Sequence, residues 1–174
     1  MNLDMNLFHK SSSKGFTLIE LLVVIGILGI LAGTLFFTIN PLEQLNRGGD
    51  AAKKTAVEGF LNGVNGFYAT QTMFPWDTNY ANDCSTGGTG VLSQVPLHNG
   101  TATHACVTEL ISVGELRDSF DEDTSVLQEI YVTADADSVA VCFAPESSSE
   151  QATANYAQDG TAYVTGDRYW CVVQ

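Results

Sequence analysis

An uninterrupted apolar segment near the N-terminus constrains this chain more than any other feature. It covers residues 16–39 (FTLIELLVVIGILGILAGTLFFTI) and contains one charged residue, Glu20. As a helix it would extend roughly 36 Å, at about 1.5 Å per residue, and the hydrocarbon core of a bilayer is about 30 Å thick. We therefore predict a single membrane span. A buried core helix is the alternative.

Charge is distributed unevenly on the two sides of the predicted span. Lys10 and Lys14 precede it, whereas most of the 20 acidic residues follow it, and the net charge of the chain is −13. The positive-inside rule then places residues 1–15 in the cytoplasm, residues 16–40 in the membrane and the head, residues 41–174, outside. The acidic balance argues against direct binding of nucleic acid or of anionic lipid headgroups, since both require basic residues.

The span is expected to stay with the protein rather than to be removed as an ordinary signal peptide. The apolar run is longer than a typical signal-peptide core, and no A-x-A cleavage site follows it. The nearest approach to a lipidation site is Leu31-Ala32-Gly33, but Thr34 stands where a cysteine would be required.

Glu20 is the residue in the span that most needs an explanation. A carboxylate within a membrane helix costs about 2.5–3.5 kcal/mol on insertion scales, so it is a candidate functional residue. The alternative is a glutamate that reaches the interface. The context of Glu20, Lys14-Gly15-Phe16-Thr17-Leu18-Ile19-Glu20, resembles the processing site of type IV prepilins and pseudopilins.

The resemblance implies specific roles for three residues. In that family a dedicated membrane peptidase cuts a short basic leader after its last glycine, and the new N-terminal residue is N-methylated. Carried over to this chain, cleavage falls between Gly15 and Phe16, Phe16 becomes the methylated N-terminus, and Glu20 serves assembly. The close match covers residues 10–40, and the rest of the chain agrees in layout only.

Elementary electrostatics is consistent with that role. Cleavage after Gly15 would create an α-amino group that is largely cationic below its usual pKa of about 7.7–8.0. If helices are staggered by one subunit, the Glu20 carboxylate of one can neutralise the Phe16 amine of its neighbour. Gly26, Gly29 and Gly33 fall on one stripe of the helix and would let such helices approach closely, unless they are incidental membrane glycines.

The remainder of the chain predicts an α+β head of the kind that pilins have. One long helix is expected from Phe16 to about Tyr68, interrupted at Asn40-Pro41 and loosened at Gly48-Gly49. Residues 70–105 should form loops, with Phe74 and Trp76 as packing anchors, and residues 108–116 a short second helix. Segments rich in valine and aromatic residues predict an antiparallel sheet, with strands at 129–133, 138–143, 161–164 and 169–173.

The four cysteines all follow the predicted span, where the compartment is oxidising: Cys84, Cys106, Cys142 and Cys171. Two disulfides have three possible connectivities, and strand positions favour Cys142–Cys171 with Cys84–Cys106. No cofactor or metal is expected, because His98, His104 and Cys106 are too loosely spaced for zinc. The acidic runs at 118–123 and 135–137 lack an EF-hand pattern, and no nucleophile motif indicates an enzyme.

We therefore predict a structural subunit of a type IV pilus or related filament. The partners implied are other copies of the chain or related subunits, a prepilin peptidase and methyltransferase, the assembly machinery of the inner membrane, and membrane lipid before assembly. The expected location is the cytoplasmic membrane and then a cell-surface filament. Two alternatives stay open: a pseudopilin of a type II secretion or DNA-uptake system, and a singly anchored surface protein with a binding head.

Overall fold

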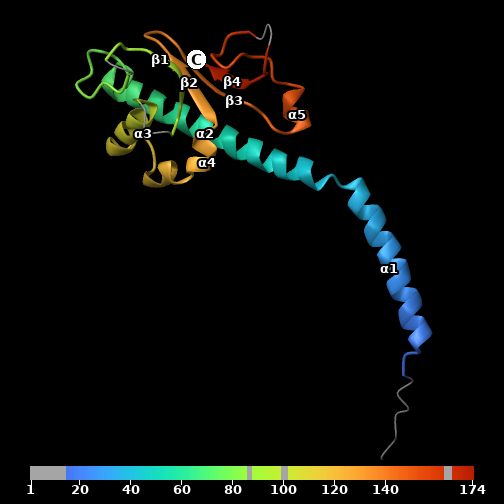
Figure 1. The fold of residues 1–174 in the computed structure, drawn as a ribbon. Helices are drawn as coiled ribbons and strands as arrows, with labels where there is room; N and C mark the ends of the chain where they lie inside the picture. Colours follow the sequence, from blue (N-terminus) through green and yellow to red (C-terminus); the bar gives the residue numbers. More distant parts are fainter. Residues whose placement is uncertain (1–14, 86–87, 99–101, 163–165) are drawn as a thin grey trace, which may run out of the picture. The chain divides into compact units, whose positions relative to one another are not determined.

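The computed structural model describes residues 15–85, 88–98, 102–162 and 166–174 (Figure 1). The chain divides into two compact units, with the boundary after Pro41. The first contains the helix α1 (Leu18–Thr38). The second, Leu42–Gln174, contains nearly all of helix α2 (Pro41–Gln71) and everything that follows it.

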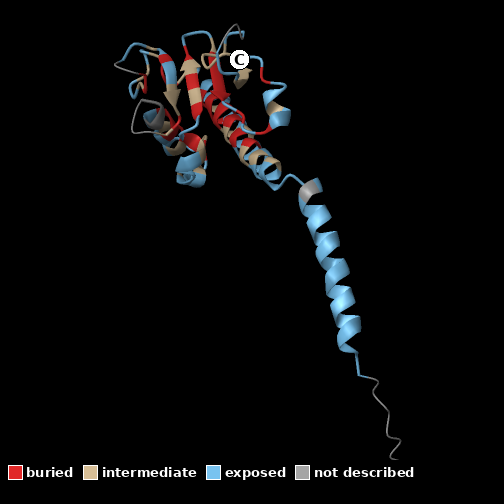
Figure 2. Ribbon diagram, turned by 45° about the vertical axis from the view of Figure 1, so that its right-hand side comes forward, coloured by how far each residue is buried: buried red, intermediate tan, exposed pale blue. Residues whose placement is uncertain are grey.

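Helix α1 is long and apolar enough to cross a membrane. Its window Leu18–Phe36 has a mean hydropathy of 2.5, and none of that window is buried inside the described chain. Figure 2 shows α1 exposed along its length.

The single long helix predicted from Phe16 to Tyr68 is two helices in the structure. Ile39 and Asn40 lie between them, at the interruption expected before Pro41. Pro41 is the first residue of α2, where the missing N–H would have had no helical partner. The prediction that Gly48-Gly49 loosen the helix is wrong, because α2 is continuous through both residues.

Helix α2 supplies one half of the hydrophobic core. Its buried apolar residues recur at three- to four-residue spacing, as one helical stripe requires: Val57, Phe60, Leu61, Val64 and Phe67. They pack in one cluster with residues of the sheet, and Figure 2 shows burial concentrated where α2 and the strands meet. The amphipathic pattern of the sequence therefore identifies the face of α2 that the head covers.

The sheet has four antiparallel strands in the order β1-β2-β3-β4, which confirms the predicted α+β class. The strands are β1 (Leu92–Pro96), β2 (Ile130–Ala134), β3 (Val139–Phe143) and β4 (Trp170–Val173). Strand β1 lies in the region expected to form loops. Its pairing with β2 is irregular between Leu92 and Val95, and Gln94 has a φ of 49°. Apolar and polar residues therefore do not alternate regularly along β1, and a strand is predicted from that alternation.

Other boundaries also differ from the expectations. The helix predicted at 108–116 is α3 (Ala102–Ser112), and the acidic run after it forms the 3₁₀ helix η1 (Asp118–Glu122). Single-turn helices α4 (Thr124–Leu127) and α5 (Ser148–Gln151) were not anticipated. The prediction of a strand at 161–164 is wrong at its start, because Ala162 forms only an isolated β-bridge with Tyr156. The rest of that prediction falls on residues 163–165, which lie outside the described chain.

Strand β3 is buried at every position, because both of its faces are covered. One face meets the core that α2 shares. On the other, the chain before β4 comes so close that a Cβ added at Gly160 would lie 2.3 Å from the Cβ of Ala140. Gly160 has a φ of 81°, so a side chain there would be excluded both by conformation and by contact.

Two disulfides brace the head, with the connectivity that the strand positions favoured. Cys142 and Cys171 are directly opposite each other in the β3–β4 register, with Cα atoms 4.2 Å apart. Cys84–Cys106 ties the loop after α2 to helix α3. Phe74 and Trp76 are packing anchors as expected: their rings stack at 4.9 Å, and the buried Trp76 Nε1 donates to the Asp135 carbonyl at 2.9 Å.

Polar contacts fasten the N-terminal half of α2 to the segment around α5. The buried carboxylate of Asp50 accepts hydrogen bonds from the Glu146 and Ser147 amides, each at 2.9 Å, and from the Ser147 hydroxyl at 2.5 Å. Lys53, also buried, forms ion pairs with Glu129 and Glu146. Burial by itself lowers the pKa of Lys53, but hydrogen bonds and attraction from these two carboxylates outweigh it and raise the pKa.

Candidate processing and assembly site

The predicted cleavage site lies just before helix α1. Residues 15–17 have no regular secondary structure, and Gly15 and Phe16 are exposed. Phe16 is 78% exposed, a high value for an aromatic side chain. A peptidase needs an extended and accessible backbone, and this segment offers both. Lys10 and Lys14, the basic residues of the predicted leader, lie outside the described residues.

Glu20 is held at the start of α1 by a reciprocal capping box with Thr17. The Thr17 hydroxyl accepts a hydrogen bond from the Glu20 amide at 3.3 Å. The Glu20 carboxylate in turn accepts from the Thr17 amide at 2.9 Å and from the Thr17 hydroxyl at 2.7 Å. Amides in the first turn of a helix have no partner within the helix, so this arrangement satisfies them.

The capping box changes the electrostatic interpretation of Glu20. The carboxylate lies in the first turn of the helix rather than far along it, and negative charge is favoured at that end by the helix dipole. It also lies beside the amide of Thr17, one residue from the Phe16 nitrogen. The structure thus places the carboxylate close in the chain to the nitrogen that cleavage after Gly15 would convert to an amine.

Sequence reasoning identified Glu20 but did not identify Thr17. The signal was present, because Thr17-x-x-Glu20 before an apolar run is the sequence pattern of a capping box. The prepilin resemblance assigns roles to Gly15, Phe16 and Glu20 and none to Thr17. Its hydroxyl both donates to and accepts from Glu20, so it positions the carboxylate.

The three glycines of the predicted assembly stripe lie on α1. A Cβ built at Gly26, Gly29 or Gly33 meets no other part of the described chain within 4 Å. Within the part of the chain that the structure describes, therefore, no contact requires glycine at these positions. Small residues on a membrane helix permit close contact with another helix, which is the role expected of them.

The remaining candidate groups are Cys106, His98 and His104. Cys106 is bonded to Cys84, and the described residues include no group of three or more His, Cys, Asp and Glu side chains placed to hold a metal ion. His98 contacts Asp121, with 2.9 Å between Nδ1 and Oδ1, and the side chain of His104 lies outside the described part.

Comparison with known proteins identifies the N-terminal segment. A model of the prokaryotic N-terminal methylation motif matches residues 10–36. The chain bears the type IV prepilin signature. The matched residues include the Gly15–Phe16 junction, Glu20 and all three glycines of α1. Searches among curated proteins and among solved structures gave no significant match.

The fold of the described chain is of the class that the prepilin signature leads one to expect. An apolar N-terminal helix, a second long helix and a small antiparallel sheet give a pilin-like α+β arrangement. The two disulfides and the membrane-length helix are also consistent with a membrane-anchored precursor. The N-terminal methylation motif thus supports a subunit of the type IV pilin or pseudopilin type.

Proposed function

We propose that this protein is a structural subunit of a type IV pilus, processed after Gly15 and polymerised through α1. The observation that carries the proposal is the coincidence of the methylation motif with an exposed Gly15–Phe16 junction and a carboxylate held in the first turn of α1. A protein that only needed an anchor would have no use for this combination.

Processing and assembly follow from the chemistry of the N-terminus. In the precursor, the basic leader keeps the N-terminus of α1 on the cytoplasmic side. Cleavage removes Lys10 and Lys14 and generates a cationic amine on Phe16, which N-methylation leaves cationic. That amine and Glu20 of an adjacent subunit neutralise each other as α1 moves from lipid into a bundle of identical helices. In a low-dielectric bundle an unpaired charge is costly, so pairing fixes the register of subunits.

The rest of the chain supplies the surface of the filament. The glycines of α1 allow neighbouring helices to approach, and the acidic heads cover the outside. The partners are other copies of the chain, a prepilin peptidase with methyltransferase activity, and an assembly platform in the cytoplasmic membrane. A pseudopilin of a secretion or DNA-uptake system would use the same N-terminal chemistry. The acidic head disfavours a direct contact between this subunit and DNA.

Replacement of Glu20 tests the role of the carboxylate in assembly. Glu20→Gln keeps the size of the side chain and a carbonyl oxygen for the Thr17 bonds, but removes the negative charge. We expect this variant to be cleaved after Gly15 and to accumulate in the membrane. Its yield in material sheared from the cell surface should fall about tenfold or more, since a single buried unpaired charge costs more than 1.4 kcal/mol. Immunoblots of both fractions measure it.

The matched control is Glu58→Gln, which removes the same charge from an exposed position on α2. It should leave the sheared yield unchanged. Wild-type yield from Glu20→Gln would show that the carboxylate has no role in assembly. Wild-type protein that is processed yet confined to membranes would favour the pseudopilin alternative instead.

A further inference from the structure

Two leucines at the start of α2 are the most exposed large apolar side chains in the described part of the head. Leu42 is 68% exposed and Leu45 is 71% exposed, whereas every other large apolar side chain described in residues 42–174 is less than half exposed. Neither leucine belongs to the hydrophobic cluster of the head. Adjacent apolar side chains that the fold leaves in water indicate a surface that contacts another molecule or a membrane.

The attachment of α2 to the head leaves these leucines free. The Glu43 carboxylate accepts a hydrogen bond from the Ser148 amide at 3.1 Å, and the Asn46 side chain donates to the Glu146 carbonyl at 3.2 Å. Together with the buried bonds of Asp50, these contacts fix one side of the helix to the segment around α5. At about 100° per residue, the two leucines lie roughly 100° around the helix from that side.

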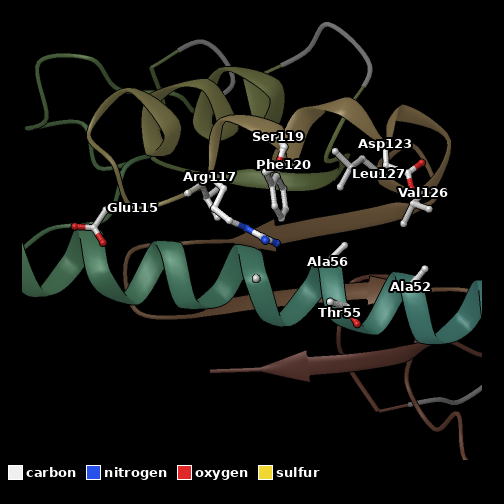
Figure 3. A pocket seen from close by; sticks show the side chains of 12 residues that line it. Ala52, Thr55, Ala56, Glu115, Arg117, Ser119, Phe120, Asp123, Val126 and Leu127 are labelled. Atoms are coloured by element: carbon white, nitrogen blue, oxygen red, sulfur yellow. The ribbon is translucent and has the colours of Figure 1, made fainter.

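Further along α2, the flank that carries the leucines faces other residues of the head. Ala52 and Ala56 continue this flank at helical spacing and line a groove between α2 and residues 115–127 (Figure 3). Phe120 and Val126 lie on the opposite wall of the groove. The leucines precede the groove by about two turns or more and are open to solvent. The open part of the flank is therefore at the end of α2 that follows α1 in the chain.

The segment that carries the leucines is electrically neutral, unlike the rest of the head. Residues 41–49 contain one acid and one base, Glu43 and Arg47, which form an ion pair at 3.1 Å. Residues 50–174 contain 4 basic and 17 acidic residues. Anionic headgroups repel an acidic surface, so the neutral segment with its two leucines is the part of the head best suited to contact a bilayer.

The covalent chain keeps this segment near the end of the membrane-length helix. Helix α1 has 21 residues and is therefore about 32 Å long, which matches a hydrocarbon core of about 30 Å. If α1 spans that core, its last residue, Thr38, lies at the boundary with the headgroups. Leu42 follows four residues later, within about 14 Å even along a fully extended chain. The headgroup layer is about 5–8 Å thick on each side, so Leu42 is within reach of it.

We propose that residues 41–49 of the precursor lie on the outer surface of the membrane, with Leu42 and Leu45 inserted among the lipid headgroups. The inference rests on the proposed function, which places α1 across the membrane before assembly. Apolar insertion is not screened by salt and needs no anionic lipid, so it is compatible with an acidic head. Because α2 is bonded to the segment around α5, the contact holds the head against the membrane surface.

Fluorescence quenching in vesicles tests the contact. The four native cysteines are paired in disulfides, so a cysteine introduced by Leu45→Cys in the full chain can be labelled selectively with an environment-sensitive fluorophore. The protein is inserted into phosphatidylcholine vesicles, with spin-labelled lipid as one quencher and iodide in the water as the other. Gln44→Cys, an exposed position on the other side of the same turn, is the matched control.

We expect quenching by the spin-labelled lipid to be several-fold stronger at position 45 than at position 44, and quenching by iodide to be correspondingly weaker. Equal accessibility of both positions to iodide would overturn the proposal. A label at position 45 that is open to water in vesicles but shielded in sheared filaments would also overturn it, and would indicate that a second copy covers the leucines.

Removal of the neighbouring leucine gives an independent measurement. Leu42→Ser, made in the chain labelled at position 45, should leave the fold intact, because Leu42 is exposed and lies outside the core. It should lower the quenching by lipid, since one of the two inserted side chains is lost. Gln44→Ser in the same labelled chain should leave the quenching unchanged. Equal quenching in the two variants would contradict the proposal.

The two proposals fail in distinguishable ways, because the vesicle measurement requires neither cleavage nor filaments. A chain that does not float with vesicles after an alkaline wash would show that α1 does not span the membrane, and would overturn both. A chain that floats, with position 45 as open to iodide as position 44, would overturn the surface contact alone. Wild-type protein that shows the contact but forms no filaments in cells would overturn the proposed pilus and leave the contact supported.

Discussion

Asp50 is the residue at which helix α2 and the segment before α5 are most tightly joined. Its carboxylate accepts two backbone amides and one hydroxyl in a buried position. Asp50→Asn would turn an NH₂ group towards one of these donors and leave it without an acceptor. We expect the free energy of unfolding to fall by about 1.5–3 kcal/mol, the range for hydrogen bonds to charged groups. Denaturant titration of the full chain in detergent measures the change.

Glu58→Gln is the control for Asp50→Asn, because it makes the same chemical change on an exposed face of α2. Its free energy of unfolding should stay within about 0.5 kcal/mol of wild type, as is usual for surface substitutions. Equal stability of the two variants would show that the bonds of Asp50 contribute nothing net to the head.

Tyr80 gives the head a predictable response to alkaline pH. Its hydroxyl donates to Glu109 at 2.5 Å, and that hydrogen bond to a carboxylate raises the pKa of Tyr80 above its usual value of 10.0. The folded state therefore holds this proton more tightly than the unfolded state does. The resulting stability is complete below about pH 10 and is lost as the pH rises through the folded-state pKa.

Tyr80→Phe should therefore lose less stability than wild type between about pH 9.5 and pH 11.5. Urea midpoints measured across that interval test the expectation. Tyr68→Phe, at an exposed tyrosine of α2 that donates no such bond to Glu109, should retain the wild-type slope. A Tyr80→Phe slope as steep as wild type would mean that the Glu109 contact does not persist in solution.

At the scale of elements, the glycines of α2 divide into two kinds. A Cβ at Gly48 would meet nothing within 4 Å, whereas one at Gly63 would lie 2.9 Å from Leu116. Alanine in an open helical position stabilises by roughly 0.5–1 kcal/mol, and overpacking costs about 1–3 kcal/mol. We expect Gly48→Ala to raise the melting temperature of the purified subunit and Gly63→Ala to lower it. A rise for both would show that the chain after α3 can move away from α2.

Helices and strands could be predicted from the sequence where apolar residues recur at one regular spacing. The membrane-length helix, the buried stripe of α2 and strands β2, β3 and β4 follow from apolar spacing and valine content. Strand β1 could not be predicted, because its irregular pairing with β2 breaks the alternation. Helices η1 and α4 depend on where the chain after α3 meets the glycines of α2, and that contact is tertiary.

The candidate site was predictable to a similar degree. Gly15, Phe16 and Glu20 could be named because the motif is local in the chain. The bonds between Thr17 and Glu20 were also local and could have been inferred from the capping-box pattern. The groove between α2 and residues 115–127 could not be predicted from the sequence, because these two parts of the chain meet only in the folded head.

At the scale of the whole molecule, the two units of the chain differ in their surfaces: one is apolar and the other acidic. One unit contains an apolar helix of membrane-spanning length, and the other is an acidic head with its own core and two disulfides. An apolar helix of this length is stable in lipid or in contact with other apolar helices. Under the proposed function, polymerisation would transfer it from the first environment to the second, and cleavage of the leader would make that transfer possible.

Intact-mass and N-terminal peptide analysis of the protein tests the central claim most directly. The sample is taken both from material sheared off the cell surface and from membranes. The account predicts that the sheared fraction contains a chain that begins at N-methylated Phe16 and has all four cysteines oxidised. A chain that retains residues 1–15 in both fractions would contradict it, and would leave an ordinary membrane-anchored protein.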